Sequence, residues 1–576
     1  MSAPALPYRE MCRIKEGRYN SEDICVTDAE NRVRQVHKVC TSKCLRMGRL
    51  VFHRGRSKRG LSSGLFWSDT GETIQRQPAL FDVGAQEVAA VLSCLWIAMA
   101  ESLQIGRSFM QILQIMARRP YHRPVNAHAP EKIVASTWSK PLLAPESIPE
   151  RADIVVIGGG IVGVSAAWFL AQQGVDVVLC EKGHIAGEQS GRNWGWVRLQ
   201  GRDTREIPMM QESMRIWAGL KDAIGEDVGF TRGGCFYTAN SRRQFAGYEK
   251  WARIAADHDI DTRLISGPEL KLHVRGSAVD WTGAMYTPSD GRAEPHLAAP
   301  AIARAAVRAG ATVLTSCAVR GLETSGGSVS AVVTEHGVIK SSTVVCVAGA
   351  WTSMFCRSLD IDVPQLRVRG TVARTAPAEK FLDGTLFDDR LGIRRRQDGG
   401  YTVADASVLE CPVTPSSFRY FFKFIPALMQ ELKLIRLSIG KDFVDEWSTP
   451  RKWNLDEVSP FEKTRVLNPD PTPGVLKGLR RNLDKVFPQL KNTPIVETWA
   501  GMIESSPDVV PIIDSIDKLP GFHVATGFSG HGFGIGPGAG KVVAGMLTGA
   551  DSGIAISAFR LSRFFDGSPI RPQSGI

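Results

Sequence analysis

The 576-residue chain lacks a hydrophobic run long enough to cross a membrane. Its only candidate is "VAAVLSCLWIAMA", the thirteen residues 88–100 between Glu87 and Glu101, whereas a spanning helix needs about 20. The segment also lies too far from Met1 to be a secretory signal. We therefore expect a buried or interfacial helix here, and any membrane contact of this chain to be peripheral.

Paired cysteines are also missing. The eleven cysteines are an odd number scattered through a large chain, which argues against a disulfide framework and indicates a reducing compartment. Cys12, Cys25, Cys40 and Cys44 lie close in sequence but form no CxxC pair, so no metal site is predicted. We expect a cytoplasmic protein, with the inner face of the membrane as the place of any peripheral contact.

Positive charge is in excess, but it is unevenly spread. The formal net charge is +11, and residues 1–150 hold 21 Lys and Arg against 14 Asp and Glu. Such a basic region can bind nucleic acid or anionic lipid, but a solvated, loosely ordered leader is the simpler interpretation. We predict no nucleic-acid partner.

The composition and the secondary-structure pattern of the sequence change along the chain. Residues 1–117 form an N-terminal extension to which the sequence assigns no fold, and residues 118–150 contain six prolines and predict a linker. From residue 153 onward, strand and helix patterns alternate with glycine at many junctions, as α/β and α+β domains require.

A dinucleotide-binding unit opens this part of the chain. A short apolar strand at 154–157 precedes Gly158, Gly160 and Gly163 in GxGxxG spacing, and a helical pattern follows over 161–173. The first glycine permits the tight turn, the second lets a pyrophosphate approach the backbone, and the third lets the helix pack on the sheet. The helix N-terminus then offers free N–H groups to the phosphates.

A second strand, at 175–180, ends at Glu181, which is placed to accept hydrogen bonds from an adenosine ribose. The acid argues against NADP but leaves NAD and FAD open. No second GxGxxG follows, and no CxxxxC pair lies near the first, so a two-nucleotide reductase remains a weaker alternative.

The next segment, "GEQSGRNWGWVRLQGRD" at 187–203, places Trp194 and Trp196 among glycines, polar residues and three arginines. It has neither the period of a plain strand nor that of an amphipathic helix. With the preceding unit, it resembles the FAD-dependent D-amino acid oxidase superfamily, which includes glycine oxidase, sarcosine oxidase and D-amino acid dehydrogenase. In that family this segment crosses the flavin; core packing is the alternative role for the two tryptophans.

Three later segments strengthen the resemblance. They are "ATVLTSCAVRGLE" (311–323), "STVVCVAGAWT" (342–352) and "GFHVATGFSGHGFGIGPGAGKVVAGML" (521–547). The resemblance, which covers about 152–560, implies a strand that contacts adenine, a strand that returns to the cofactor, and a glycine-rich turn that aims backbone amides at the flavin.

The resemblance therefore implies an α/β plus α+β enzyme at 151–560, with a Rossmann-type FAD-binding domain and an antiparallel-sheet substrate domain. By resemblance, the FAD-binding parts are about 151–240, 295–355 and 495–550, the substrate-domain parts are about 241–294 and 356–494, and 561–576 form a C-terminal tail. The implied cofactor-binding residues are Gly158, Gly160, Ile161, Val162, Gly163, Glu181, Lys182, Ser190, Arg192, Asn193, Gly195, Trp196, Val197, Val319, Gly349, Trp351, Gly530, His531, Gly532, Phe533 and Gly534.

Family members oxidise the C–N bond of an amino acid or amine by hydride transfer to FAD, giving an imine that hydrolyses to an oxo acid. Dioxygen and quinone are both open as electron acceptors. A non-catalytic flavin-binding subunit of a larger complex is the other alternative.

The substrate carboxylate calls for an arginine, whose planar fork pairs with it bidentately. "LGIRRRQDGGYTVADA" at 391–406 predicts a β-hairpin in which Arg394 and Arg396 share one face and Arg395 lies on the other. Alignment with the family favours Arg396 as the clamp, with Arg394 next. A solvated basic hairpin is the alternative.

The chain departs from glycine oxidase in the C-terminal turn, where Gly530 stands at the position of a second carboxylate-binding arginine. Arg394 or an arginine of the tryptophan segment, such as Arg198, would then compensate, unless the substrate is not a simple small amino acid. His531 is assigned to hydrogen bonding with the flavin in preference to a role as general base.

Overall fold

The structure is a computed structural model that describes residues 147–573. The predicted extension, the helix at 88–100, the cysteine cluster and the linker up to residue 146 lie outside the described residues. Within the described part of the chain, no helix is both long and apolar enough to cross a membrane.

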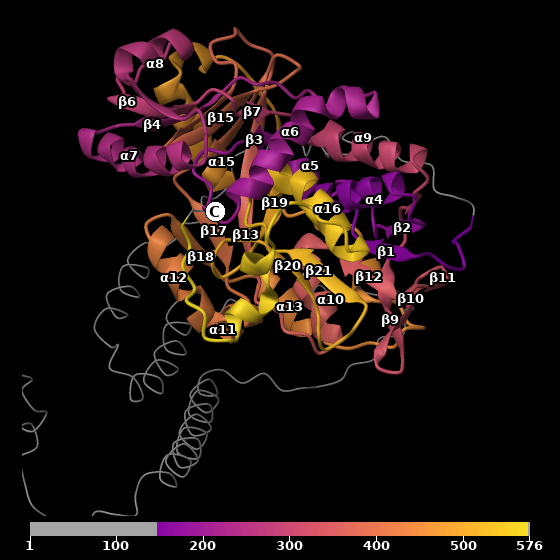
Figure 1. Cartoon of the computed structure of the whole chain (residues 1–576). Coiled ribbons are helices and arrows are strands. Elements are labelled where there is room, and N and C mark those ends of the chain that lie inside the picture. The colour runs from indigo at the N-terminus through magenta and orange to yellow at the C-terminus, as the bar shows by residue number, and fades with distance from the viewer. Residues whose placement is uncertain (1–146, 574–576) are drawn as a thin grey trace, which may run out of the picture. The chain divides into compact units, whose positions relative to one another are not determined.

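The first sheet has six strands in the order β20–β21–β12–β1–β2–β8 (Figure 1). All neighbours are parallel except β20 and β21. Every residue of β1 and β2 is buried, as a parallel sheet covered on both faces requires. The strands are β1 (Ile154–Ile157), β2 (Val177–Cys180), β8 (Thr312–Leu314), β12 (Thr343–Cys346), β20 (Ile512–Ser515) and β21 (Phe522–Thr526).

Helices α4 (Ile161–Gln172), α9 (Pro295–Arg308) and α16 (Gly532–Thr548) gather beside β1 and β2 in Figure 1, and α6 (Ile207–Ile224) packs on α16. Glycine allows α4 and α16 to meet closely, because a Cβ at Gly540 would lie 2.4 Å from the Cβ of Ser165. A three-stranded antiparallel sheet of β9 (Val319–Ser325), β10 (Ser328–Thr334) and β11 (Gly337–Lys340) completes this half of the molecule.

The second sheet has ten strands and is mostly antiparallel; only the pairs β4–β14 and β17–β18 are parallel. Its longest strands, β13 and β19, pair along almost their whole length. The strands are β4 (Cys235–Ala239), β5 (Arg263–Ser266), β6 (Gly283–Thr287), β13 (Leu366–Thr375), β14 (Thr385–Asp388), β15 (Leu391–Arg395), β16 (Tyr401–Asp405), β17 (Leu409–Pro412), β18 (Ile435–Ser438) and β19 (Ile495–Ser505).

Helices α7 (Arg242–Asp257), α8 (Gly267–His273) and α15 (Pro473–Val486) pack against strands of this sheet. Between β17 and α15 the chain forms α11 (Pro415–Arg419), α12 (Phe421–Glu431), β18, α13 (Lys441–Ser448) and α14 (Pro460–Lys463). The predicted combination of an α/β dinucleotide-binding fold with a larger, mainly antiparallel sheet is confirmed.

The predicted elements of the first unit are also confirmed, with small shifts. The helix ends at Gln172, and the second strand begins at Val177. The tryptophan segment has more regular structure than the sequence suggested. It contains one helical turn, α5 (Gln189–Arg192), and a two-residue strand, β3 (Trp196–Val197), which pairs with β7 (Gly291–Arg292). Because that partner lies far along the chain, the local pattern could not reveal it.

Candidate active site

One cavity of about 560 Å³ runs between the two sheets, a size common for ligand sites. One end is lined by the glycine turn after β1 and by the end of β2. The other end is lined by the tryptophan segment, by Tyr237 of β4 and by residues of β13 and β19. The cavity therefore joins the dinucleotide-binding unit to the larger sheet.

The glycine turn has no room for side chains. Gly158 has φ +117°, and a Cβ there would lie 2.6 Å from the carbonyl oxygen of Val347. A Cβ at Gly163 would lie 2.0 Å from the carbonyl oxygen of Gly158. The first helical N–H groups have no partner within their own helix, and Ser190 Oγ accepts one of them, from Ile161 at 2.9 Å.

Glu181 organises the same end of the cavity. Its carboxylate accepts hydrogen bonds from the N–H groups of Gly159 and Gly183, both at 2.7 Å. Burial raises the pKa of this carboxyl. A carboxylate has about four acceptor positions, so lone pairs remain for ribose hydroxyls. The turn, the helix N-terminus and the acid thus fit the pyrophosphate and adenosine ribose of FAD.

Lys182 and Trp351 frame this end from two segments. Glu188 accepts hydrogen bonds from Lys182 Nζ at 2.7 Å and from Trp351 Nε1 at 2.9 Å. Lys182 Nζ also lies 4.3 Å from the centre of the Trp351 ring. Charge and hydrogen bonding hold the two side chains together at the wall.

Polar side chains of the tryptophan segment hold the segment itself. Arg192 donates to Asn468 Oδ1 at 2.5 Å and to the carbonyl oxygen of Ala500 at 3.0 Å. Asn193 accepts from the N–H of Gly195 at 2.7 Å. Both residues line the cavity, but these side-chain contacts are made to protein.

Trp194 and Trp196 both line the cavity and meet edge to face, with ring centres 5.4 Å apart. Trp194 also lies over Gly392 of β15, where a Cβ would come within 2.6 Å of the indole. The two rings therefore form part of the cavity wall while packing on the larger sheet.

The C-terminal turn forms as expected. Gly530 has φ +82°, and His531 is the residue before α16. His531 Nδ1 lies 3.2 Å from Glu206 Oε2, and burial lowers the pKa of the histidine. The pairing brings the turn against the start of α6, two segments 325 residues apart.

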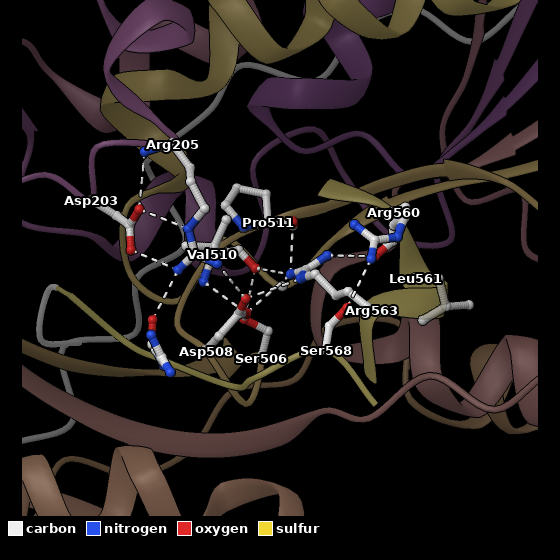
Figure 2. A network of polar contacts seen from close by, with 12 residues as sticks. Asp203, Arg205, Ser506, Asp508, Val510, Pro511, Arg560, Leu561, Arg563 and Ser568 are labelled. Carbon is white, nitrogen blue, oxygen red and sulfur yellow. Dashed lines mark hydrogen bonds and ion pairs between the residues drawn. The ribbon is translucent and has the colours of Figure 1, made fainter. Parts of the chain in front are cut away.

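An ion-pair network anchors these two segments (Figure 2). Arg205 pairs with Asp203 at 2.7 Å and with Asp508 at 2.9 Å. Arg563 donates two hydrogen bonds of 3.0 Å to the same Asp508. Next to it, the N–H of Ser506 donates to Ser529 Oγ, directly before the glycine turn.

The arginines of the predicted clamp are not among the residues that line the cavity. Arg394 is 1% exposed and makes two hydrogen bonds of 2.9 Å to the carboxylate of Glu294. Arg396 donates to Asp398 at 3.0 Å and lies 3.9 Å from Glu294. Burial alone would raise the pKa of Glu294, but Arg394 holds that pKa well below its usual range.

The predicted alternation of this hairpin is confirmed, because Arg395 points away from Glu294 and lies 4.9 Å from the ring centre of Tyr401. A contact between substrate and Arg394 or Arg396 stays a prediction. Glu294 was not predicted from the sequence, since nothing in its local pattern connects it with a hairpin 100 residues later.

Four other arginines do line the cavity: Arg192, Arg198, Arg202 and Arg369. Arg198 lies 5.5 Å from the ring centre of Tyr237. Arg202 is 4% exposed, and its Nη1 is buried with no hydrogen-bond partner. Burial and the neighbouring Arg198 lower the pKa of Arg202 to about 10. Sequence reasoning named Arg198 only as a substitute and overlooked Arg202.

Glu504 of β19 was also not predicted as a site residue from the sequence. It lines the cavity, is 4% exposed, and has one carboxylate oxygen, Oε2, without a partner. Burial raises its pKa to about 7. Only the strand pairing that brings it to the cavity wall could have identified it.

Most of the residues assigned to the cofactor line this one cavity. Those that line it are Gly158, Gly160, Ile161, Val162, Glu181, Lys182, Ser190, Arg192, Asn193, Trp196, Val319, Gly349, Trp351, Gly530, His531, Gly532 and Phe533. Gly163, Gly195, Val197 and Gly534 are not among the residues that line it. Contact of any of them with FAD stays a prediction.

Comparison with known proteins agrees with this geometry. The family described as FAD dependent oxidoreductase matches residues 153–546. The mitochondrial sarcosine dehydrogenase of Mus musculus is 26% identical over 439 residues, covering 74% of this chain and 42% of that protein. The sarcosine oxidase subunit beta of Rhodobacter capsulatus is 23% identical, covering 75% of this chain and 93% of that protein.

Among solved structures, the L-amino acid deaminase of Proteus myxofaciens in complex with anthranilate is 31% identical, with a TM-score of 0.71. The similarity covers 74% of this chain and 97% of that one. By contrast, the chain matches less than half the length of the mouse sarcosine dehydrogenase. Since the family match extends over more than half of its residues, this chain belongs to the FAD dependent oxidoreductase family.

Proposed function

We propose that this FAD-dependent oxidoreductase oxidises the C–N bond of an amino acid or secondary amine, giving an imine that water hydrolyses to an oxo acid. One observation carries the proposal: a single cavity joins the phosphate-binding turn to a wall of aromatic and arginine side chains. The names of the relatives, which include sarcosine oxidase and L-amino acid deaminase, support an amino acid or N-methyl amino acid as substrate.

FAD, when bound, supplies a two-electron acceptor for the hydrogen and electron pair of the substrate. The protein supplies binding and orientation. The glycine turn and Glu181 hold the nucleotide, and the paired Trp194 and Trp196 rings keep water from the wall they form. The arginines beside these rings attract the substrate carboxylate. The position of the substrate is therefore set by charge as well as by the shape of the cavity.

The test is anaerobic reduction of the full-length protein by a panel of D- and L-amino acids, N-methyl amino acids and hydroxyprolines. We expect yellow protein whose visible flavin absorbance is lost with at least one of these compounds. Denaturation should release a flavin that carries adenine. A colourless protein that binds NAD would contradict the cofactor assignment, and a yellow protein that no compound reduces would favour the non-catalytic subunit.

We also propose peripheral contact with a membrane and quinone as the electron acceptor. Large apolar side chains stand exposed on α12 and α13: Phe422 is 61% exposed, Met429 63% and Trp447 74%. Both helices contact α11, and several large exposed apolar side chains on adjoining elements are typical of contact surfaces. The protein should float with lipid vesicles, and Phe422→Ser/Trp447→Ser should not. If neither the wild type nor the variant floats, and hydrogen peroxide forms at turnover, dioxygen is favoured as the electron acceptor.

A further inference from the structure

Glu504, the last residue but one of β19, carries a carboxyl group that is only partly satisfied. The residue is 4% exposed and lines the cavity, and its Oε2 has no hydrogen-bond partner among the described residues. A buried polar atom that lacks a partner costs about 1–3 kcal/mol, and such atoms are rare in native proteins. Because this atom lies at a cavity wall, a bound ligand is the natural partner for it.

The neighbours of Glu504 place this carboxyl at the phosphate-binding end of the cavity. The N–H of Glu504 donates to Gln189 Oε1 at 3.3 Å. The residue after Gln189 is Ser190, which accepts the N–H of Ile161 at the start of α4. A Cβ at Gly349 would lie 3.9 Å from Glu504 Oε2 and 3.0 Å from Gln189 Nε2. The free oxygen therefore belongs to the same part of the wall as the helix N-terminus that fits a pyrophosphate.

The cations around Glu504 have other partners. Arg367 of β13 lies opposite Glu504 in the strand pair, but it donates to the carbonyl oxygen of Ala350 at 2.8 Å. Lys182 forms an ion pair of 2.7 Å with Glu188. The carboxyl of Glu504 is therefore not held in its charged form by a cation in the way that Glu188 is.

The surroundings favour the uncharged form of this carboxyl. Burial raises the pKa of Glu504 to about 7, and the negative charge of Glu188 acts in the same direction, while hydrogen bonds from the backbone and from Gln189 act against them. A bound pyrophosphate adds negative charge, which disfavours ionisation further. A protonated carboxyl carries one O–H donor, and that donor matches a phosphate oxygen.

We propose that Glu504 is a further cofactor-binding residue, which acts as a neutral acid: its Oε2–H donates a hydrogen bond to a pyrophosphate oxygen of FAD. Gln189 positions the carboxyl from the neighbouring segment. An ionised carboxylate at the same place would repel the phosphate, so this part of the site binds FAD only while Glu504 keeps its proton. The proposal rests on FAD as the cofactor and is independent of which substrate is oxidised.

The first test needs no turnover. The dissociation constant of FAD is measured on diluted full-length holoprotein from the rise of flavin fluorescence on release. Glu504→Gln keeps the size of the side chain and an N–H donor, and should leave FAD binding within about threefold of wild type. Glu504→Leu has no donor and should weaken FAD binding by roughly 10- to 100-fold, as loss of a hydrogen bond to a charged group implies.

Glu497→Gln is the matched control. Glu497 lies on the same strand and is also buried, but its carboxylate lies 3.3 Å from Arg374 and the residue is not among those that line the cavity. This variant should leave FAD binding within about twofold of wild type, because a twofold change is less than 0.5 kcal/mol. Equal weakening by Glu504→Gln and Glu504→Leu would overturn the proposal, since a neutral donor would then fail to replace the acid.

The second test is the pH dependence of the same dissociation constant. FAD should bind wild type less tightly as the pH rises from 7 to 9, because Glu504 must then keep a proton that the flavin-free protein releases. His531 also lines the cavity, but burial lowers its pKa, so it stays uncharged over this range. Glu504→Gln should remove the pH dependence. The proposal is wrong if wild type and Glu504→Gln follow the same pH profile.

The two tests also separate this proposal from the proposed function. A protein that binds no flavin would overturn both the cofactor assignment and the role of Glu504. Flavin that no amino acid or amine reduces would overturn the proposed function alone, because both FAD titrations are made without substrate.

Discussion

Two pairs of arginines meet at the tryptophan segment, and their surroundings differ: Arg394 and Arg396 are both buried, whereas Arg202 is buried and Arg198 is partly exposed. Arg394 and Arg396 are matched by Glu294, and Arg394 also donates to the carbonyl oxygen of Trp194. Arg202, beside Arg198, has a buried nitrogen without a partner. The comparison shows that burial of an arginine does not identify a binding site.

The largest difference between the pairs should appear in stability. Arg394→Met strands the buried carboxylate of Glu294 and should lower the free energy of unfolding by about 3–5 kcal/mol, the usual cost of breaking a buried ion pair from one side. Arg202→Met breaks no hydrogen-bonded ion pair among the described residues and should lower the free energy of unfolding by less than Arg394→Met does. Urea unfolding of both holoproteins measures the two free energies of unfolding. Equal losses of unfolding free energy in the two variants would contradict the difference between the two arginine pairs.

The carboxylates of the two clusters should respond oppositely to pH. Arg394 keeps Glu294 ionised, whereas burial raises the pKa of Asp290, beside Arg198, to about 7. The folded state therefore holds the Asp290 proton more tightly than the unfolded state. Its stabilising effect is full below about pH 4 and is lost as pH rises through about 7, by up to about 4 kcal/mol.

Asp290→Asn measures this effect. The difference in unfolding free energy between wild type and variant should decrease steadily from pH 4 to pH 8. A difference that increases with pH would mean that Asp290 is ionised in the folded protein and that Arg198 is paired after all.

The two arginine pairs also differ in the space around a neighbouring glycine, and the expected effect on stability is smaller. Gly195 has φ +78°, and a Cβ there would lie 2.5 Å from Arg394 Nε and from the carbonyl oxygen of Ala293. Gly195→Ala should therefore lower the unfolding free energy by about 2–3 kcal/mol, from strain and overlap together. Gly201, with φ +73° and its nearest neighbour at 3.4 Å, is the control. Gly201→Ala should lower the unfolding free energy by about 1–2 kcal/mol from strain alone. Equal losses of unfolding free energy in the two variants would show that the Arg394 side chain moves away from the new methyl group at no cost.

Arg395 should show the smallest effect. It donates to the carbonyl oxygen of Ala378 at 2.9 Å and lies over Tyr401, away from Glu294 and outside the cavity. Arg395→Ala should change the unfolding free energy by about 1 kcal/mol or less. KM and flavin content should be unaltered. A larger change in KM would place the substrate on this face of the hairpin.

The cofactor end could be predicted from the sequence because its signals are local. The glycine turn, its helix and Glu181 lie within about 30 residues, and each has a fixed geometric role. The hairpin and its alternation were predictable for the same reason. The long-range contacts were not, because Glu294 meets Arg394 from 100 residues away and His531 meets Glu206 from 325 residues away. Family alignment selected Arg396 by position, and position carries no information about the carboxylate of Glu294 beside it.

The strand order of the first sheet has a consequence for how the protein is made. β1 lies between β2 and β12, so one edge of this apolar strand stays without its partner until residues 343–346 have been synthesised. The glycine turn at 530 follows Gly158 by about 370 residues, which is roughly 20–70 s at ribosomal speeds. Until β12 has been synthesised, this apolar strand edge is unpaired, and unpaired strand edges are prone to aggregation. Gly158 and Gly530 both line the cavity, so the cavity is complete only after both segments have been synthesised.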